Sequence, residues 1–154
     1  MLVLELIMII LKYKDKDIDN IMSECERVLK NRGIIAYPTE SYYALGVLAT
    51  DEQAIERLFE LKRRPEDKPL PLIVGDEFVL RTIVRSVPDA AKELMNEFWP
   101  GPLTILFEAQ DNVPEILSGK TGKVAVRIPG KSFALQMVKA LKLPVTSTSA
   151  NITS

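Results

Sequence analysis

The sequence predicts an α/β fold made of one domain over residues 1–154, and two observations lead to this prediction. Short apolar segments alternate with longer segments whose apolar residues recur every three or four positions, which is typical of strands interleaved with helices. Hydrophobic residues make up 47% and charged residues 27% of the chain, as in soluble globular domains with a sizeable core. We therefore expect a single twisted, mixed sheet, partly or wholly parallel, with flanking helices.

The chain begins with an apolar run and a helix pattern. The run over residues 3–11 is too short to span a bilayer and Glu5 interrupts it, so we interpret it as a buried strand. Asp17 or Asp19 can cap the helix that follows, and the turn at 31–33 ends that helix. The residues expected on its inward face are Ile18, Ile21, Met22, Cys25, Val28 and Leu29.

The next pair of elements is a short strand and a second helix. The strand is expected over 34–37, and Thr50 with Gln53 fits a capping box that opens the helix. Its inward residues would be Ala54, Ile55, Leu58 and Phe59. A loop rich in basic residues then leads to a strand over 70–74.

The second half of the chain continues the alternation. Asp76 can begin a helix, and another is expected over 88–98, with a further one over 131–141. The helix over 88–98 is expected to bury Ala91, Leu94, Met95 and Phe98. The helix over 131–141 is expected to bury Phe133, Ala134, Met137, Val138 and Leu141. Strands are expected over 103–107, 124–128 and 144–148.

The residue types that are missing or rare exclude several chemistries. The absence of histidine excludes Ser-His-Asp and Cys-His catalysis and any metal held by histidine. The single Cys25 excludes an intrachain disulfide, which favours the cytoplasm, and its place on an apolar helix face indicates an inert core residue. The formal net charge of −1 provides no overall attraction for nucleic acid. No acidic residue follows Glu115, however, so the basic last part of the chain could line an anion site.

Four unusual segments lie at or beside the ends of the predicted elements, and together they are hard to explain as surface features. They are YPTESYYALG at 37–46, KRRPEDKPL at 62–70, FWPGPLT at 98–104, and VAVRIP at 124–129 with TSTSAN at 146–151. The basic loop could hold a polyanion such as a nucleotide triphosphate, although such a loop alone is often only solvated surface. We interpret the turn at 99–102 as structural, shaping the wall of a pocket. The SGKT at 118–121 lacks the glycine of a P-loop, because Pro114 takes its place, and it is interpreted as a glycine turn.

Within these segments several side chains suit ligand binding. Thr39 and Ser41 follow a strand, where ligands bind in α/β sheets, although a capping turn would also explain them. Arg127 interrupts an apolar strand, and its charge requires either a buried carboxylate or a bound anion. The hydroxyls and amide at 147–151 suit phosphate or ribose contacts, and a polar turn near the end of the chain is the alternative.

Taken together, the four segments resemble the YrdC family, the threonylcarbamoyl-AMP synthases. The family patterns are close to PTETVYGLG, K-x-R-P-x-x-[KN]-P-L, WPGPLT, VAVRxP and TSAN. At the matching places this chain reads PTESYYALG, KRRPEDKPL, WPGPLT, VAVRIP and TSAN. The match runs in the same order from about residue 33 to 151. The resemblance implies a nucleotidyltransferase that makes L-threonylcarbamoyladenylate from L-threonine, bicarbonate and ATP and releases pyrophosphate. Its product would reach tRNA indirectly, through the threonylcarbamoyl-transferase complex, with no role for a membrane.

The resemblance also implies site residues on a concave, positively charged cleft. The threonine contacts would be Ser41, Arg127 and Ser147. The ATP contacts would be Arg64, Lys68, Lys123, Ser149 and Asn151. The catalytic residues, which neutralise the triphosphate and the charge at the α-phosphorus, would be Lys62, Arg64 and Lys68. Mg²⁺ would be held through the phosphates rather than by protein ligands, and no enzymic nucleophile is needed.

The sequence departs from the family pattern at three places. Ser41 replaces the usual Thr and keeps the hydroxyl, and Tyr43-Ala44 stands where Tyr-Gly is common. The chain ends at Ser154, soon after TSAN, where family members usually continue, so we expect a C-terminal end that is short or truncated, and mobile without ligand. The short C-terminal end leaves open a ligand-binding member that has lost catalysis. Two further alternatives are an RNA-binding module, because a basic concave surface would also serve RNA, and a carbamoyl-transfer module like the related domain in hydrogenase maturation proteins.

Overall fold

The computed structural model describes residues 8–12, 14 and 17–152, and within them the strands form two hydrogen-bonded sheets. The first sheet is antiparallel and has the order β1-β2-β7, formed by Ile35–Pro38, Tyr43–Gly46 and Thr148–Ser149. The second is mixed and has the order β4-β5-β3-β6, formed by Ile105–Glu108, Lys123–Arg127, Leu72–Ile73 and Val145–Thr146. In the second sheet β3 is parallel to β5, whereas β4 and β6 are antiparallel to their neighbours.

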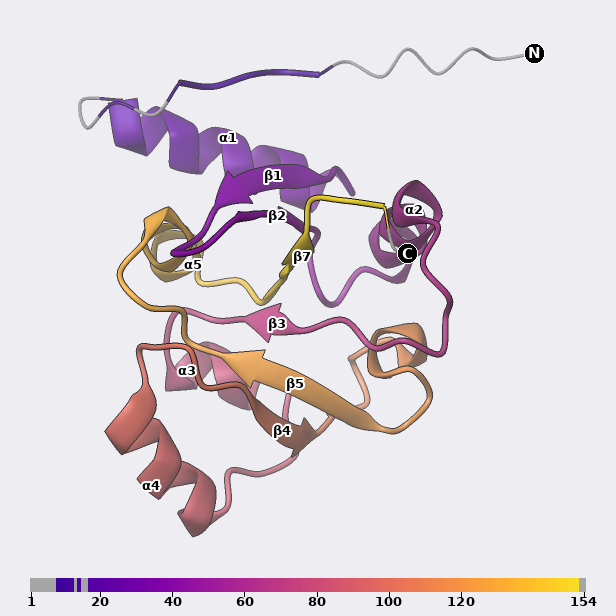
Figure 1. The fold of residues 1–154 in the computed structure, drawn as a ribbon, viewed down its shortest axis with the longest axis vertical. Helices are drawn as coiled ribbons and strands as arrows, with labels where there is room; N and C mark the ends of the chain where they lie inside the picture. Colours follow the sequence, from indigo (N-terminus) through magenta and orange to yellow (C-terminus); the bar gives the residue numbers. More distant parts are fainter. Residues whose placement is uncertain (1–7, 13, 15–16, 153–154) are drawn as a thin grey trace.

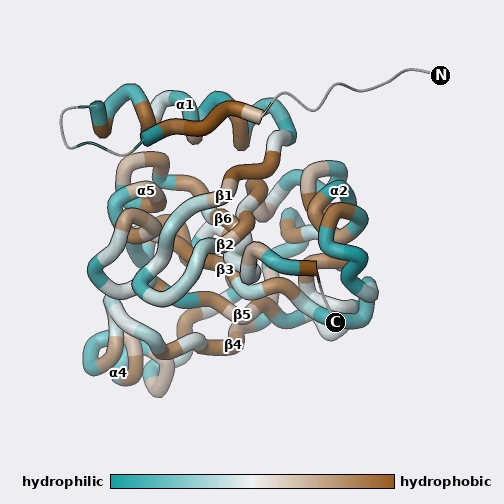
Figure 2. The backbone as a smooth tube through the Cα atoms, turned by 45° about the horizontal axis from the view of Figure 1, so that its top comes forward, coloured by the Kyte–Doolittle hydropathy of each residue, from teal (hydrophilic) through white to brown (hydrophobic). Residues whose placement is uncertain are grey.

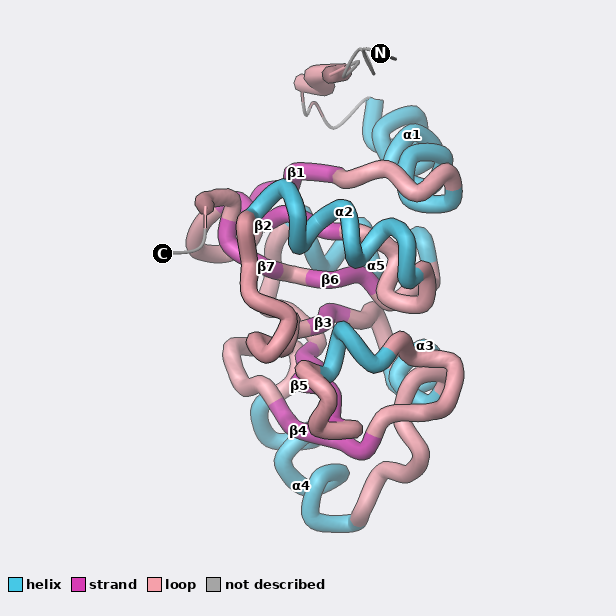
Figure 3. Tube along the Cα trace, turned by 90° about the vertical axis from the view of Figure 1, so that its right-hand side faces the viewer, coloured by secondary structure: helices cyan, strands magenta, loops and turns pink. Residues whose placement is uncertain are grey.

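The two sheets meet along residues 47–49, which directly follow β2. The N–H of Ala49 donates to the carbonyl of Pro144, and the N–H of Thr146 donates to the carbonyl of Val47, both at 3.0 Å. Figure 3 shows the strands of both sheets stacked as one twisted layer. The α/β class with a twisted mixed sheet is therefore confirmed, although the predicted single sheet divides into two hydrogen-bonded groups.

Helices cover both sides of this layer (Figure 1). The helices are α1, α2, α3, α4 and α5, formed by Ile18–Lys30, Glu52–Lys62, Glu77–Arg81, Asp89–Phe98 and Phe133–Leu141. A 3-10 helix, η2, spans Glu115–Ser118. Apolar residues of α1 and α5 share one core cluster with β1 and β6, and α2, α3 and α4 share another with β3, β4 and β5. The structure thus has two cores, one on each side of the layer.

Short polar side chains begin three of the helices. The carboxylates of Asp51 and Asp76 accept hydrogen bonds from the third residue of α2 and of α3, and Ser132 does the same at α5. The capping box predicted at Thr50 is therefore wrong by one residue, because the Asp51 carboxylate makes the bond. Asp17 stands at the N-cap of α1 as predicted, but its side chain makes no capping hydrogen bond.

Three further predictions about the elements are wrong. Residues 8–11 form no strand and are exposed. They run past α1 on the side away from the sheet, so no described strand lies beside them (Figures 1 and 3). Figure 2 shows them as a hydrophobic stretch beside α1. Residues 3–7 of that predicted strand lie outside the described residues. On α4, Leu94 and Phe98 are exposed, since only Ala91 and Met95 face the core. The strand expected over 144–148 divides at Ser147 into β6 and β7, which belong to different sheets.

The helix predictions allow a direct stability test on α2. Leu58 is 0% exposed whereas Leu61 on the same helix is 53% exposed. We expect Leu58→Ala to lower the free energy of unfolding by about 2–5 kcal/mol, because truncation leaves a cavity in a packed core. Leu61→Ala is the control and should change it by less than about 0.5 kcal/mol. Chemical denaturation measures both, and equal losses would contradict the assigned inward face.

Candidate functional site

One face of β5 is the floor of the candidate site. Side chains alternate along β5, so Val124 and Val126 enter the core while Lys123, Ala125 and Arg127 share the other face. At β6 the chain continues to Ser147, whose N–H donates to the carbonyl of Pro71 at 2.8 Å. Beside this floor stands the turn that connects β1 to β2.

That turn is built around the hydroxyl of Thr39. Thr39 Oγ1 accepts from the N–H groups of Ser41 and Tyr42, both at 3.2 Å, and donates to the carbonyl of Tyr42 at 2.6 Å. The hydroxyl of Ser41 lies 3.3 Å from the same oxygen. These bonds fix the backbone of Glu40, which lies between them in the chain. The capping-turn interpretation of this segment is therefore confirmed for Thr39.

Arg127 has a carboxylate partner. Its Nη1 donates to Oε1 of Glu40, across the space between β5 and the β1–β2 turn. The arginine side chain is 20% exposed and the glutamate side chain 29% exposed, so the pair is shielded but reachable from solvent. Of the two partners that the sequence left open for Arg127, the structure contains the carboxylate.

Tyr37 lies at the back of this pair. Its hydroxyl donates to the carbonyl of Thr146 at 2.9 Å, and its side chain is buried. Burial raises the pKa of the Tyr37 hydroxyl well above its usual value. A hydrogen bond with Ser147 and the positive charge of Arg127 oppose this rise, and the negative charge of Glu40 adds to it. The charges of Arg127 and Glu40 therefore lie within electrostatic reach of the Tyr37 hydroxyl, and Ser147 lies beside it.

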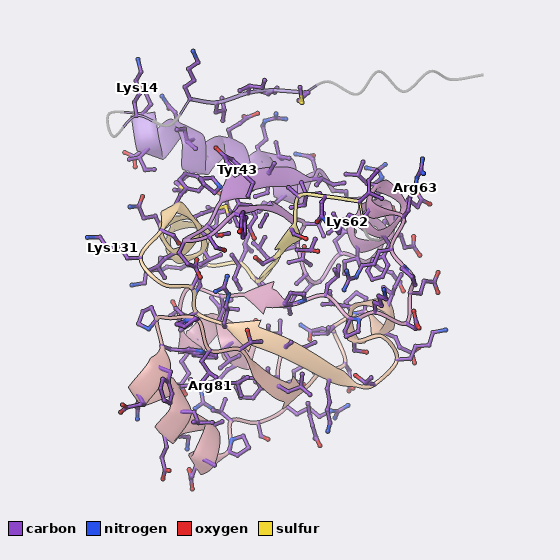
Figure 4. All side chains as sticks on the ribbon, viewed as in Figure 1. Lys14, Tyr43, Lys62, Arg63, Arg81 and Lys131 are labelled. Carbon is purple, nitrogen blue, oxygen red and sulfur yellow. The ribbon has the colours of Figure 1, made fainter. Side chains whose placement is uncertain are left out.

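The basic loop has a different arrangement, because its cations hold backbone carbonyls. Lys62 is 2% exposed, and its Nζ donates to the carbonyls of Ser149 and Asn151, both at 2.6 Å. Burial and, secondarily, the charge of Arg64 lower the pKa of Lys62. Figure 4 shows Lys62 directed at the C-terminal segment, whereas Arg63 points outward. Lys62 therefore braces the turn that carries Ser149.

Arg64 fixes the loop that follows. Its Nε donates to the carbonyl of Lys68 at 3.1 Å and its Nη2 to that of Pro69 at 2.8 Å. Burial lowers the pKa of Arg64. The loop packs against the turn that ends η2, where a Cβ added at Gly119 would lie 2.9 Å from the carbonyl oxygen of Asp67. Lys68 itself is exposed, and only its backbone carbonyl is bonded by Arg64.

The predicted site residues thus fall into two groups. Ser41, Arg127 and Ser147 gather around Glu40 and Tyr37, and Arg64, Lys68, Ser149 and Asn151 gather around Lys62. Lys123 begins β5 and lines a depression of about 420 Å³, and Arg64 lines another of about 440 Å³. Neither depression includes Arg127, so the single concave basic cleft stays a prediction.

Sequence reasoning did not name three residues of the site, which are Tyr37, Glu40 and Thr146. Glu40 was available as the carboxylate in YPTES, beside two hydroxyl residues at the end of a strand. Tyr37 and Thr146 carried no such signal, because their role depends on pairing between distant segments. Among the described residues there is no cluster of three or more metal-ligating side chains, and no described helix is long and apolar enough to cross a membrane.

The fold and the two groups of polar residues define the class of protein. The Sua5/YciO/YrdC family model, described as telomere recombination, matches residues 27–154. The chain therefore belongs to this family.

Named relatives and solved structures agree with this assignment. The threonylcarbamoyl-AMP synthase of Pyrococcus abyssi is 39% identical over 119 residues, which are 77% of this chain and 35% of the relative. That of Klebsiella pneumoniae subsp. pneumoniae is 38% identical over 128 residues, 82% of this chain and 67% of the relative. The chain thus spans about a third to two thirds of the length of these relatives.

Two solved structures have the same fold. P. abyssi Sua5 complexed with L-threonine superposes with a TM-score of 0.80 and 35% identity, over 85% of this chain and 38% of that one. E. coli YciO superposes with a TM-score of 0.72 and 28% identity, over 84% of this chain and 63% of that one. The likeness to HypF, with a TM-score of 0.74 at 18% identity over 86% of this chain and 21% of that one, concerns the fold alone.

The brace at Lys62 can be tested by removing only its charge. Lys62→Met keeps most of the aliphatic stem but removes the donor to both carbonyls, and the Ser149 carbonyl then keeps only the N–H of Asn151. Each hydrogen bond to a charged group is worth roughly 1.5–3 kcal/mol, so the turn at 149–151 should open more often. We expect faster hydrogen exchange at the amide of Ala150, which bonds Tyr43. Lys68→Met, on an exposed side chain of the same loop, is the control. Unchanged hydrogen exchange in Lys62→Met would show that the turn at 149–151 does not depend on Lys62.

Proposed function

We propose that the chain is one YrdC-like domain that makes L-threonylcarbamoyladenylate from L-threonine, bicarbonate and ATP, with release of pyrophosphate. The observation that carries the proposal is Arg127, a partly exposed cation on β5 that pairs with Glu40 of the β1–β2 turn, in the group that also contains Ser41 and Ser147. Support comes from the threonylcarbamoyl-AMP synthases among the relatives and from the Sua5 structure complexed with L-threonine.

In this proposal the threonine half of the site lies around Arg127. The guanidinium binds the substrate carboxylate through charge-assisted hydrogen bonds, which are stronger than neutral ones. The hydroxyls of Ser41 and Ser147 bind the polar groups of the amino acid. The Tyr37 hydroxyl, whose pKa burial raises, stays protonated and keeps its hydrogen bond to the Thr146 carbonyl behind the site.

The ATP half of the proposed site lies around the basic loop. Arg64, Lys68 and Lys123 neutralise the phosphates, and Ser149 and Asn151 contact the nucleotide. Lys62 acts through its charge and through its hold on the turn at 149–151. ATP enters with Mg²⁺ on its phosphates, so the metal arrives with the substrate.

The proposed chemistry requires positioning and charge rather than a protein nucleophile. The substrate amine attacks the carbon of bicarbonate and water leaves, which gives a carbamate. The carbamate oxygen attacks the α-phosphorus of ATP, and the bond to pyrophosphate breaks. Holding the reactants together supplies much of the rate acceleration, and fixed cations stabilise the charge that develops at the phosphorus.

The direct test of this function is an assay of the chain with ATP, labelled bicarbonate and each amino acid in turn. Pyrophosphate and a labelled adenylate that appear only with threonine support the proposal. Nucleotide binding without either product would favour the non-catalytic alternative. We also propose a cytoplasmic setting, on the single cysteine, and delivery of the product to tRNA through a separate transferase complex.

The role of Arg127 has its own test. Arg127→Ala should weaken L-threonine binding about ten- to a hundredfold, because a lost charge-assisted hydrogen bond is worth roughly 1.5–3 kcal/mol. ATP binding should change by less than about threefold, since the phosphates lie on the other group of residues. Calorimetry measures both, with circular dichroism to confirm folding. Arg81→Ala, which removes an exposed arginine paired with Glu77 on α3, is the control. Unchanged threonine affinity in a folded Arg127→Ala would make Arg127 a structural residue.

A further inference from the structure

The ion pair at the centre of the threonine group uses few of the available polar atoms. Glu40 receives one hydrogen bond at Oε1, from Nη1 of Arg127. An arginine has five N–H donors and a carboxylate has two oxygens, so each group keeps capacity for further bonds. Within the described part of the chain, no other hydrogen bond or ion pair of either side chain is present. Both side chains are also reachable from solvent, with exposures of 20% and 29%.

The position of the pair indicates a ligand site rather than a surface salt bridge. Of the other ion pairs among the described residues, four join residues three or four positions apart, as in Arg81–Glu77 on α3. The two that join distant segments, Arg32–Asp51 and Arg85–Asp111, each have an arginine side chain more than half exposed, whereas that of Arg127 is 20% exposed. Arg127 and Glu40 come from β5 and the β1–β2 turn, which are far apart in the sequence. Thr39 fixes the backbone on one side, and Tyr37 and Ser147 lie behind the pair. Both charges are therefore held in place.

A held pair of opposite charges matches an α-amino acid better than it matches a simple carboxylate. At neutral pH an amino acid carries a carboxylate and an ammonium group on the same carbon. An isolated arginine would accept any carboxylate, whereas a neighbouring Glu40 repels a lone carboxylate and attracts an ammonium group. The pair therefore provides an opposite charge for each charge of the substrate: Arg127 for the carboxylate, and Glu40, the ammonium pole of the site, for the ammonium group.

We propose that Glu40 receives the α-ammonium group of the amino acid while Arg127 binds its carboxylate, so that Glu40 is a specificity-determining residue. The inference rests on the proposed function for the identity of the amino acid. It assigns to Glu40 the discrimination between L-threonine and hydroxy acids that lack the amine. The Nη1–Oε1 contact persists on binding, and the substrate bridges the remaining atoms of the two groups.

The test compares two ligands on three proteins. The ligands are L-threonine and (R)-3-hydroxybutyrate, which has the same carbon chain, hydroxyl and carboxylate but no ammonium group. Calorimetry should show that the unaltered chain binds threonine at least about tenfold more tightly, as expected for one charge-assisted hydrogen bond. Glu40→Gln should weaken threonine binding, leave hydroxybutyrate binding equal or stronger, and so remove the preference. Glu40→Asp, which keeps the charge, should restore part of it.

Three results would overturn the proposal. Equal weakening of both ligands in Glu40→Gln would mean that Glu40 only positions Arg127. Equal tightening would mean that Glu40 competes with the ligand for Arg127. An unaltered chain with no preference would mean that no ammonium pole exists. Glu77→Gln is the matched control, because it removes the carboxylate of another Glu–Arg pair and should leave both affinities unchanged.

A parallel assay of pyrophosphate release separates this inference from the proposed function. A preference for threonine that depends on Glu40, without pyrophosphate release, would keep the ammonium pole and reject the adenylate-forming activity. Pyrophosphate release with threonine, together with an unchanged preference in Glu40→Gln, would keep the activity and reject the pole. Circular dichroism of each variant confirms that it is folded.

Discussion

The arrangement of this domain depends on Thr146, a fully buried residue that joins the two sheets. Its N–H donates to the carbonyl of Val47, its hydroxyl oxygen accepts from the N–H of Val47, and its carbonyl accepts from the hydroxyl of Tyr37. Every polar group of Thr146 is thus bonded across the junction, and a buried polar group without a partner would be costly. The junction therefore fixes how the antiparallel sheet sits beside the mixed sheet.

This junction also sets the spacing between the two halves of the candidate site. Directly after Thr146 the chain passes from β6 to β7, so Ser147 belongs to the group around Arg127 while Ser149 belongs to the group around Lys62. Two residues of extended chain span about 7 Å. Under the proposed function, this short separation places the carboxylate end of an amino acid and the phosphates of a nucleotide side by side. The reactants would then be brought together by the same buried hydrogen bonds that hold the sheets.

The sequence predicted the helices better than the strands, for a physical reason. A helix such as α5 makes its own hydrogen bonds and shows its apolar face at a spacing of three or four residues, so its local sequence suffices. The strands β3, β6 and β7 have two residues each and depend on partners far along the chain. The apolar residues at 8–11 could not be told from a strand, because their exposure depends on whether a neighbour lies beside them. In the site, the need of Arg127 for a partner was predictable, whereas the choice of Glu40 required the three-dimensional pairing.

The basic loop also depends on partners elsewhere in the chain. The sequence predicts cations directed at a ligand, and in the structure Lys62 and Arg64 bond four backbone carbonyls between them. A carbonyl is neutral, so these bonds leave the positive charges in place while they restrict the side chains. Fixed charges need little rearrangement when a negative charge develops nearby, which is the condition for electrostatic stabilisation of a transition state. The hydrogen bonds that hold the C-terminal turn and the loop therefore also prepare the field that the proposed phosphate chemistry would use.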